Sequence, residues 1–527
     1  PAAGGFRVCW AEGRGYALLA PRPFAAGERL FAERPFFRRP GPKALVKHKD
    51  VLVSAEWTES FKGIAESLKL PGEQLDAKVY ASTAMVRAAF GYATADEEVR
   101  EQLAKLHCPS LDFGHPLVIV TRRVAQLCIE YLPECTGFPL DELHRGILAI
   151  EMNIFSGGHV FATASRINHS CFPNVVSVAA KDCRTVRALR PIKEGEEVLS
   201  SYLGKELLLP TEIRRHHLWR SKCFWCDCRR CMARTDEMRA IPCKRCAEAT
   251  FGHDTVEVGT DLVALVKFLL QPNAGHASTT AILAAISQAS EVRDDLDPCL
   301  SLPHFSFCSR RSDLPWVPYA QFQGDAWFCE RCGEALRDQQ LLLSTERWLN
   351  RLAERTLFSP EMTTALGTIR SRAGARIPMK MVTSSFLTTV IDLVASVCRV
   401  LGPRHWTVQW ARLLFVDLMI SRLDYMGNME RLRVCRRREG EEEPAFMLLS
   451  MLKDLWDWLG SLNLAHDPSC FLHARTSEAI CLLEPMLSLM NPECSALFEE
   501  LRIRLSSSPA QVEMLPMQPL LVQGSIF

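Results

Sequence analysis

The stretch RINHSCFPNVV, residues 166–176, places Asn168, His169, Ser170 and Cys171 side by side between apolar residues. Polar groups in an apolar setting must find partners, because each unpaired group lowers stability. Four adjacent polar side chains, where Val or Leu would suit a core, therefore indicate a site rather than simple packing.

Strand patterns surround this stretch. Two segments, RPFAAGERL at 22–30 and RPIKEGEEV at 190–198, follow one pattern, Arg-Pro-apolar-x-x-Gly-Glu-x-apolar. Each carries a Gly where a tight turn between strands needs a positive φ. The echo predicts two similar turns in one small β fold, and chance similarity between common turns is the alternative. Further strands are expected over 159–165, 174–180, 184–189 and 196–202.

Helical patterns separate the two β parts and return in the second half of the chain. Residues 381–400 have apolar side chains at three-four spacing and contain Asp392, which favours a core-facing helix over a membrane span. Residues 296–318 lack a period and read as a loop. The other predicted helices cover 56–70, 97–107, 144–155, 339–358, 409–426, 445–462 and 492–505.

Composition describes an ordinary globular chain. It has 527 residues, 48% of them hydrophobic, and a formal net charge of +1, which favours neither nucleic-acid nor membrane binding. This length suits three or four domains or subdomains. Residue 1 is Pro, and no basic segment followed by an apolar run opens the chain, so we expect no secretory signal. The expected location is cytoplasmic, nuclear or both.

The 21 cysteines are unevenly placed, and eight lie within residues 171–246. The stretch CFWCDCRRC supplies Cys223, Cys226, Cys228 and Cys231. Its Cys-x-Cys-x-x-Cys part can place three thiolates around a tetrahedral zinc, and Cys223 or a distant cysteine would be the fourth ligand. A redox role would need a thioredoxin-like βαβ context, which does not precede it.

Two further Cys-x-x-Cys knuckles occur, Cys243 with Cys246 and Cys329 with Cys332. Two knuckles make one four-thiolate site, so a second zinc is predicted here. The alternative is two unpaired knuckles or ordinary buried thiols, because the knuckles lie far apart in the chain.

Three elements in order, RINHSCFPN, GEEVLSSY at 195–202 and PTEIRRHHLWRSKCFWCDCRRC at 210–231, resemble SET-domain lysine methyltransferases of the SMYD family, especially arthropod SmydA-like members. The resemblance implies an α+β fold: a split β-rich SET domain with a helical insertion, a Cys-rich zinc-binding post-SET region and an α-helical C-terminal domain. Residues 36–107 contain no Cys, so the family's MYND zinc finger is expected to be absent. The expected boundaries are 1–40 and 144–205 for the SET domain, 41–143 for the insertion, 206–335 for the post-SET region and 336–527 for the C-terminal domain.

The resemblance also implies roles for individual residues. Tyr202 would be catalytic and line the methyl-transfer channel, and Phe224 would cover the adenine of S-adenosylmethionine. In this fold the post-SET segment covers the cofactor, so Cys171 is predicted to complete the zinc site of Cys226, Cys228 and Cys231, with Cys223 as the rival ligand. The residues expected to bind the cofactor are Arg14, Tyr16, Asn153, Asn168, His169, Tyr202 and Phe224.

The sequence thus predicts a protein-lysine N-methyltransferase with two structural zinc ions, acting on a histone or another protein. The alternative is an inactive SET-fold scaffold that binds partners through its C-terminal helices. A zinc-dependent nucleic-acid binder built on the basic stretch 214–230 would leave the SET motifs unexplained. The substrate lysine and the methylation state do not follow from the sequence.

Overall fold

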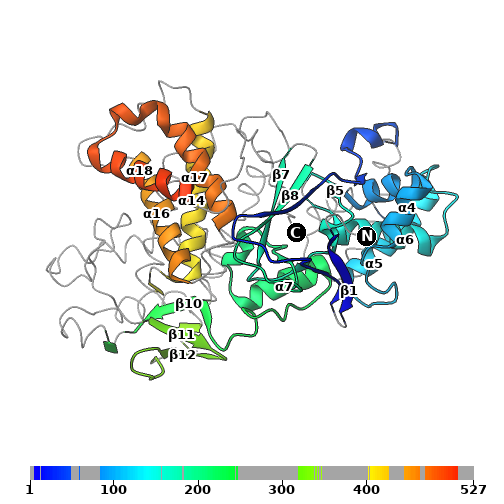
Figure 1. The fold of residues 1–527 in the computed structure, drawn as a ribbon. Helices are drawn as coiled ribbons and strands as arrows, with labels where there is room; N and C mark the ends of the chain where they lie inside the picture. Colours follow the sequence, from blue (N-terminus) through cyan, green and yellow to red (C-terminus); the bar gives the residue numbers. More distant parts are fainter. Residues whose placement is uncertain are drawn as a thin grey trace. The chain divides into compact units, whose positions relative to one another are not determined.

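The computed structural model describes residues 5–11, 14–48, 59, 84–155, 157–180, 183–243, 245–246, 319–336, 339–340, 342–343, 346, 401–402, 404–425, 444–462 and 469–507. The chain divides into two compact units. Unit 1 holds the described residues up to Gly204 together with Glu212–Cys231, and unit 2 holds Lys205–Thr211 and the described residues from Met232 onward. Both units mix helices with small sheets, so the α+β prediction is confirmed (Figure 1).

Unit 1 is built around a three-stranded antiparallel sheet. Its central strand is β8 (Cys183–Ala188), with β3 (Arg29–Glu33) on one side and β7 (Val175–Ala180) on the other. Side chains alternate in burial along β8, so Val186 and Ala188 face the apolar core. The other strands of this unit are β1 (Arg7–Ala11), β2 (Gly15–Leu19), β4 (Phe37–Arg38), β5 (His159–Val160), β6 (Asn168–His169) and β9 (Leu199–Ser200).

The two similar sequence segments form matching turns that face each other. Phe24 and Ile192 exchange both backbone hydrogen bonds, each at 2.9 Å. Gly27 and Gly195 have φ angles of 79° and 73°, which only glycine adopts at little cost. In each turn the Glu after the Gly pairs with the Arg that opens the segment, at 2.8 Å in the first and 2.7 Å in the second. The repeated pattern therefore marks a structural pair and not a coincidence.

Two predicted strands are much shorter than expected. The segments 159–165 and 196–202 contribute only β5 and β9, each of two residues. The reason in the first segment is a short 3-10 helix, η3 (Ala164–Arg166). The backbone N–H groups of Thr163 and Ala164 donate to the Glu33 carboxylate at 2.8 and 3.0 Å, so a side chain replaces the strand partner.

The described part of the insertion between the two β parts is helical, as predicted. It contains η2 (Pro42–His48), a helix over 84–93, α4 (Glu97–Ala104), α5 (Pro116–Tyr131) and α6 (Leu140–Asn153). Helices α5 and α6 pack through a core that includes the fully buried Leu127, Leu143 and Ile147. The predicted helix over 56–70 falls outside the described residues.

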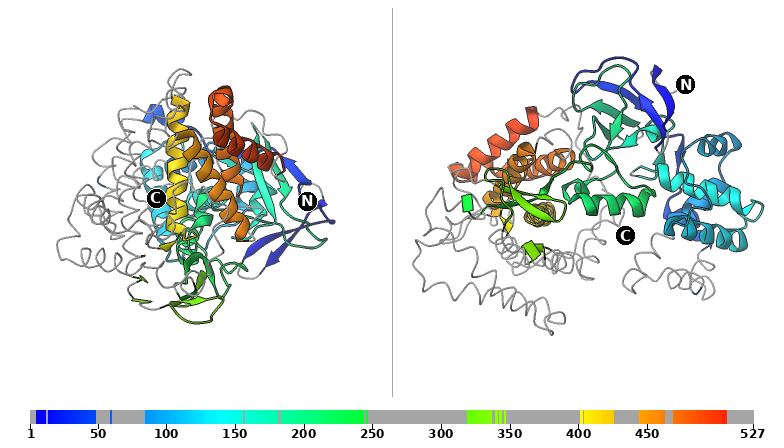
Figure 2. Two further views of the ribbon diagram at one scale, coloured as in Figure 1. Left: turned by 90° about the vertical axis from the view of Figure 1, so that its left-hand side faces the viewer. Right: turned by 90° about the horizontal axis from the view of Figure 1, so that it is seen from below.

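Unit 2 combines a small sheet with packed helices. Strands β10 (Asp236–Pro242), β11 (Tyr319–Gln323) and β12 (Ala326–Cys329) form an antiparallel sheet in that order. Among the helices described, none is long and apolar enough to cross a membrane, and residues 381–400 lie outside the described set. The helices, drawn yellow to red in Figure 2, are α14 (Trp406–Tyr425), α16 (Pro444–Ser461), α17 (Ser469–Leu483), the 3-10 helix η8 (Glu484–Leu489) and α18 (Pro492–Ser507).

Candidate functional site

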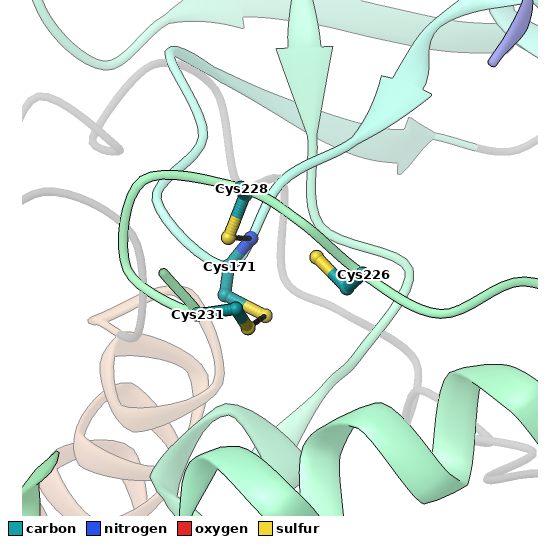
Figure 3. A group of neighbouring side chains, drawn as sticks. All are labelled: Cys171, Cys226, Cys228 and Cys231. Atoms are coloured by element: carbon teal, nitrogen blue, oxygen red, sulfur yellow. Dashed lines mark hydrogen bonds between the residues drawn. The ribbon is translucent and has the colours of Figure 1, made fainter. Parts of the chain in front are cut away.

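Four buried cysteines of unit 1 converge beside β6, the Asn-His strand formed by Asn168 and His169. Cys171 follows β6, while Cys226, Cys228 and Cys231 lie on the segment after α7 (Thr211–Lys222). Their sulfur atoms all lie within 4.8 Å of one another, and Figure 3 shows the later segment curling around Cys171. Four thiolates at this spacing suit a tetrahedral zinc. The predicted grouping of these four thiols is confirmed, and we call it the SET cluster.

Cys223, the rival ligand, lies outside the SET cluster. Its sulfur atom is 3.3 Å from Nδ1 of His115. Its φ of 59° makes it the one non-glycine residue with positive φ among those the structure describes. Its backbone N–H donates to the Trp219 carbonyl at 3.0 Å, so α7 ends in a sharp turn here. This turn sends the chain from Lys222 to Phe224 in a new direction.

A buried cation lies beside the SET cluster. Arg214, on α7, is fully buried, and its Nη2 atom is 3.7 Å from the Cys231 sulfur. A zinc held by four thiolates carries a net negative charge, which a buried guanidinium offsets. The backbone N–H of Cys171 also donates to the Cys228 sulfur at 3.3 Å. A buried positive charge and a backbone N–H therefore lie against two of the four sulfurs, those of Cys231 and Cys228.

The second predicted group, the ribbon cluster, also assembles. Cys243 and Cys246 follow β10, while Cys329 ends β12 and Cys332 follows it, and the four sulfurs lie within 4.8 Å of one another. The φ of 71° at Gly333 lets the second knuckle turn back, and its N–H donates to the Cys329 carbonyl at 2.9 Å. The pairing of two distant knuckles is confirmed as a geometry that fits zinc.

The Asn-His strand, β6, runs parallel to β9, with Asn168 opposite Leu199 and His169 opposite Ser200. The His169 ring uses both nitrogens inside the protein: Nδ1 accepts the Tyr202 N–H at 2.9 Å, and Nε2 lies 3.3 Å from the Cys171 sulfur. Burial lowers the pKa of His169 to about 3, so the ring is neutral. A cofactor contact from His169 would therefore come from its backbone, not from its ring.

Three rings gather at the end of β9. The His169 and Tyr202 centroids lie 5.3 Å apart, and Phe224 is 5.9 Å from His169 and 6.3 Å from Tyr202. The Tyr202 hydroxyl donates to the Ile167 carbonyl at 2.7 Å, and the residue is 38% exposed. Desolvation and the Glu197 carboxylate raise the pKa of Tyr202, so its phenol is neutral at any physiological pH. Tyr202 and Phe224 therefore form one aromatic wall, in which the two rings meet edge to face.

The first turn supplies Arg14 and Tyr16. Arg14 pairs with Asp227 at 2.9 Å and with Glu197 at 3.5 Å, and Glu197 also accepts from Asn168 at 2.9 Å. Two predicted cofactor residues thus meet on a single carboxylate. The Tyr16 ring lies under the Arg166 guanidinium, 5.2 Å from its centroid.

Asn153 lies at the end of α6 and is buried. Its Nδ2 donates to the carbonyls of His107 and Ala149 at 2.8 and 2.7 Å. Its two amide hydrogens are thus used within the insertion.

A Cβ added to Gly15 would come within 3.0 Å of the His107 ring, so the glycine of the first turn lets this part of the insertion approach β2 closely.

Sequence reasoning missed Lys222, the last residue of α7. Its ammonium donates to the carbonyls of Glu151 and Met152 at 3.2 and 2.8 Å and lies 5.9 Å from the Tyr202 ring centroid. Burial lowers the pKa of Lys222 to about 8, although Glu151 favours the charged form. Arg214 was also missed. Both are basic residues on a polar helix, and only the tertiary fold separates them from the exposed ones.

Comparison with known proteins identifies a domain in this part of the chain. Residues 15–203 match the family model of the SET domain, a range that contains β2, β6 and β9. The SET cluster and Phe224 extend beyond this range, onto the segment after α7.

The chain is also similar to curated lysine methyltransferases over part of its length. It is 27% identical over 158 residues to N-lysine methyltransferase SMYD2-A of Xenopus laevis, a match covering 30% of this chain and 34% of that protein. It is 33% identical over 111 residues to N-lysine methyltransferase SMYD2 of Gallus gallus, covering 21% and 23% of the two chains. It is 32% identical over 114 residues to N-lysine methyltransferase SMYD2 of Homo sapiens, a match covering 22% of this chain and 24% of that protein. The matched parts span about a quarter to a third of these relatives, and the chain contains a SET domain.

Proposed function

We propose that the protein is a protein-lysine N-methyltransferase that uses S-adenosylmethionine. The observation that carries the proposal is the junction at β6 and β9, where the Asn-His strand, Tyr202 and Phe224 meet within hydrogen-bond and ring-contact distance. These residues are the ones that resemble the SMYD motifs, and most lie in the range matched by the SET domain. The SMYD2 relatives are named as N-lysine methyltransferases, which supports the same reaction.

The reaction needs a neutral lysine amine. A free lysine has a pKa of about 10.4, so removing its proton at pH 7 costs on the order of 4–5 kcal/mol. S-adenosylmethionine supplies an electrophilic methyl group when bound. The aromatic wall of Tyr202 and Phe224 desolvates the incoming side chain, which lowers its pKa and favours the neutral form.

Tyr202 acts by positioning. Its hydroxyl hydrogen is donated to the Ile167 carbonyl at 2.7 Å, so its oxygen lone pairs remain to accept a hydrogen bond from the amine. An amine held in this way would direct its own lone pair away from the tyrosine. With its raised pKa the neutral phenol is not a base. The proton must therefore leave the lysine before transfer.

Asn168 and Arg14 are proposed to hold the cofactor's polar end. Both already contact the Glu197 carboxylate, so a ligand carboxylate approaching Arg14 would compete with Glu197 and Asp227 for its guanidinium. Zinc in both clusters is proposed to be structural, because four thiolates fill every position of a tetrahedral site. The substrate is a protein lysine, whose surrounding sequence is not specified by these residues.

The test is methyl transfer with a tyrosine control. Incubation with radiolabelled S-adenosylmethionine and cell extract should label protein lysines, and Tyr202→Phe should reduce the rate roughly tenfold or more or change the number of methyl groups added. Tyr92→Phe is a matched control, because the Tyr92 hydroxyl lies 3.4 Å from Glu142 within the insertion. Equal rates in Tyr202→Phe and wild type would remove Tyr202 from the mechanism.

The scaffold alternative is tested by calorimetry. A catalytic SET domain must bind S-adenosylmethionine, and Phe224→Ala should weaken that binding because it removes the ring expected to cover the adenine. A folded chain that binds no S-adenosylmethionine would favour the scaffold.

A further inference from the structure

The His169 ring lies between the SET cluster and Tyr202, and its two hydrogen bonds determine its tautomer. A backbone N–H only donates, so Nδ1 must accept from Tyr202 at 2.9 Å. An Nδ1 that accepts carries no proton, so the proton of the ring is on Nε2, which lies 3.3 Å from the Cys171 sulfur. The Nε2–H group donates toward this sulfur.

The metal side requires the same tautomer. A zinc-bound cysteine is a thiolate, which accepts hydrogen bonds and has no proton to give. A proton on Nδ1 would break the contact with the Tyr202 N–H and leave no donor for Cys171. The contacts at Nδ1 and at Nε2 thus require the same tautomer of the His169 ring.

Packing restricts the ring further. His169 is 9% exposed and contacts Tyr202 and Phe224 at centroid distances of 5.3 and 5.9 Å. Its backbone is paired with Ser200, and the next residue, Ser170, donates to the Ser200 carbonyl at 2.9 Å. A change at the Cys171 sulfur is therefore passed to Tyr202 through a ring with little freedom to move.

We propose that His169 is a positioning residue that links the metal site to the catalytic tyrosine, holding the Tyr202 backbone through Nδ1 and the Cys171 thiolate through Nε2. Outer groups that hydrogen-bond to metal ligands commonly change metal affinity by 10–100-fold. The link rests on the proposed function for the roles of zinc and Tyr202. A zinc ion in the SET cluster would then have a second role, because its presence would set the orientation of Tyr202.

Two substitutions separate the two arms of the ring. His169→Asn keeps an oxygen near the Nδ1 position and loses the reach to Cys171. His169→Gln places an amide near the Nε2 position and loses the acceptor for Tyr202. His169→Phe removes both, and His144→Phe is the matched control. His144 is also buried, and its Nε2 contacts the Val118 carbonyl at 3.0 Å and the Thr121 hydroxyl at 3.1 Å within the insertion.

The experiment uses the full chain loaded with ¹¹³Cd and labelled with 3-fluorotyrosine. The ribbon cluster gives an internal reference cadmium signal, and the seven tyrosines give a fluorine spectrum in which Tyr202→Phe assigns one line. His169→Asn should shift only the SET-cluster cadmium signal, His169→Gln only the Tyr202 fluorine signal, and His169→Phe both. Zinc release from the SET cluster to a chelator should be about tenfold faster in His169→Asn. The His144→Phe control should shift neither signal.

A histidine ¹⁵N spectrum of the wild-type chain tests the link without any variant. It should show His169 as the Nε2–H tautomer, and an Nδ1–H tautomer would overturn the proposal. Unchanged cadmium and Tyr202 fluorine signals in His169→Phe would overturn it as well. None of these measurements needs S-adenosylmethionine or methyl transfer, so the link and the proposed function fail by different results.

Discussion

Among the described residues, four cysteines gather at two places, and the two clusters lie in different structural settings. The ribbon cluster closes β10, β11 and β12, which already pair with one another through backbone hydrogen bonds. The SET cluster joins Cys171 to the segment 223–231, which contains neither helix nor strand. Apart from the cysteines, side-chain hydrogen bonds hold that segment. One example is the bond that Arg215 donates to the Cys226 carbonyl at 2.7 Å.

This difference in setting determines what a bound zinc ion would contribute to each cluster. In the ribbon cluster it would reinforce a sheet whose strands already determine the geometry. In the SET cluster it would replace the missing backbone ladder between two segments and place Phe224 and Tyr202 on one wall. The same ligand set therefore serves local stability in one place and site assembly in the other.

The largest expected effect comes from breaking the SET cluster. Cys171→Ser should lose one of the two proposed zinc ions and most binding of S-adenosylmethionine, because the segment 223–231 loses its tie to β6. Cys223→Ser is the matched control and should lose neither, because its sulfur contacts His115 and not the cluster. Elemental analysis and calorimetry measure the two quantities. If Cys223→Ser lost a zinc ion and Cys171→Ser lost none, Cys223 and not Cys171 would be the fourth ligand.

A smaller effect on function is expected from the ribbon cluster. Cys332→Ser should also lose one zinc, but the sheet hydrogen bonds between β11 and β12 remain. We expect a lower midpoint of thermal unfolding for unit 2 with binding of S-adenosylmethionine within about twofold of wild type. A loss of cofactor binding as large as that of Cys171→Ser would mean that the two clusters do not differ in their tasks.

Much of this comparison could be predicted from the sequence, because its signals are local. The spacing of Cys226, Cys228 and Cys231 indicates a metal site by itself, and the two distant knuckles pair by ligand count. The two turns repeat a nine-residue pattern that places Gly27 and Gly195 at positive φ. Patterns of this kind can be recognised in a sequence because metal binding or the backbone conformation requires them within a few residues.

What the sequence did not predict depends on contacts between distant residues. Nothing about Arg214 or Lys222 distinguishes them from the other basic residues of α7 until the fold buries one beside the Cys231 sulfur and places the other on the α6 carbonyls. The direction of the His169 ring is a similar case, because a ring in the Asn-His strand can face either a cofactor or a metal. Its partners, Cys171 and Tyr202, decide between these two only in three dimensions.

The smallest of the three expected effects concerns Glu346, a buried charged residue that contacts the sheet of β10, β11 and β12. It tests whether this sheet is stabilised by charge as well as by its strands and cysteines. Glu346 is buried and accepts from Arg239 of β10 at 2.8 Å and contacts His405 at 3.0 Å. Burial alone would raise the pKa of Glu346, but His405 and Arg239 lower it to about 2 from an ordinary value of 4.5. A carboxyl with a depressed folded pKa adds stability above its unfolded pKa, and that stability is lost as the pH falls from about 4.5 toward 2.

Glu346→Gln should therefore destabilise unit 2 by on the order of 3 kcal/mol at pH 7, and this difference from wild type should shrink steadily below pH 4.5. Urea unfolding of both chains across this range measures it, and zinc loss in acid affects both alike. Glu334→Gln is the control, because the Glu334–Arg245 pair is largely exposed and contributes little. A difference that stays constant down to pH 3 would show that Glu346 acts by packing. The ribbon sheet would then depend on its strands and cysteines, without help from the buried charge.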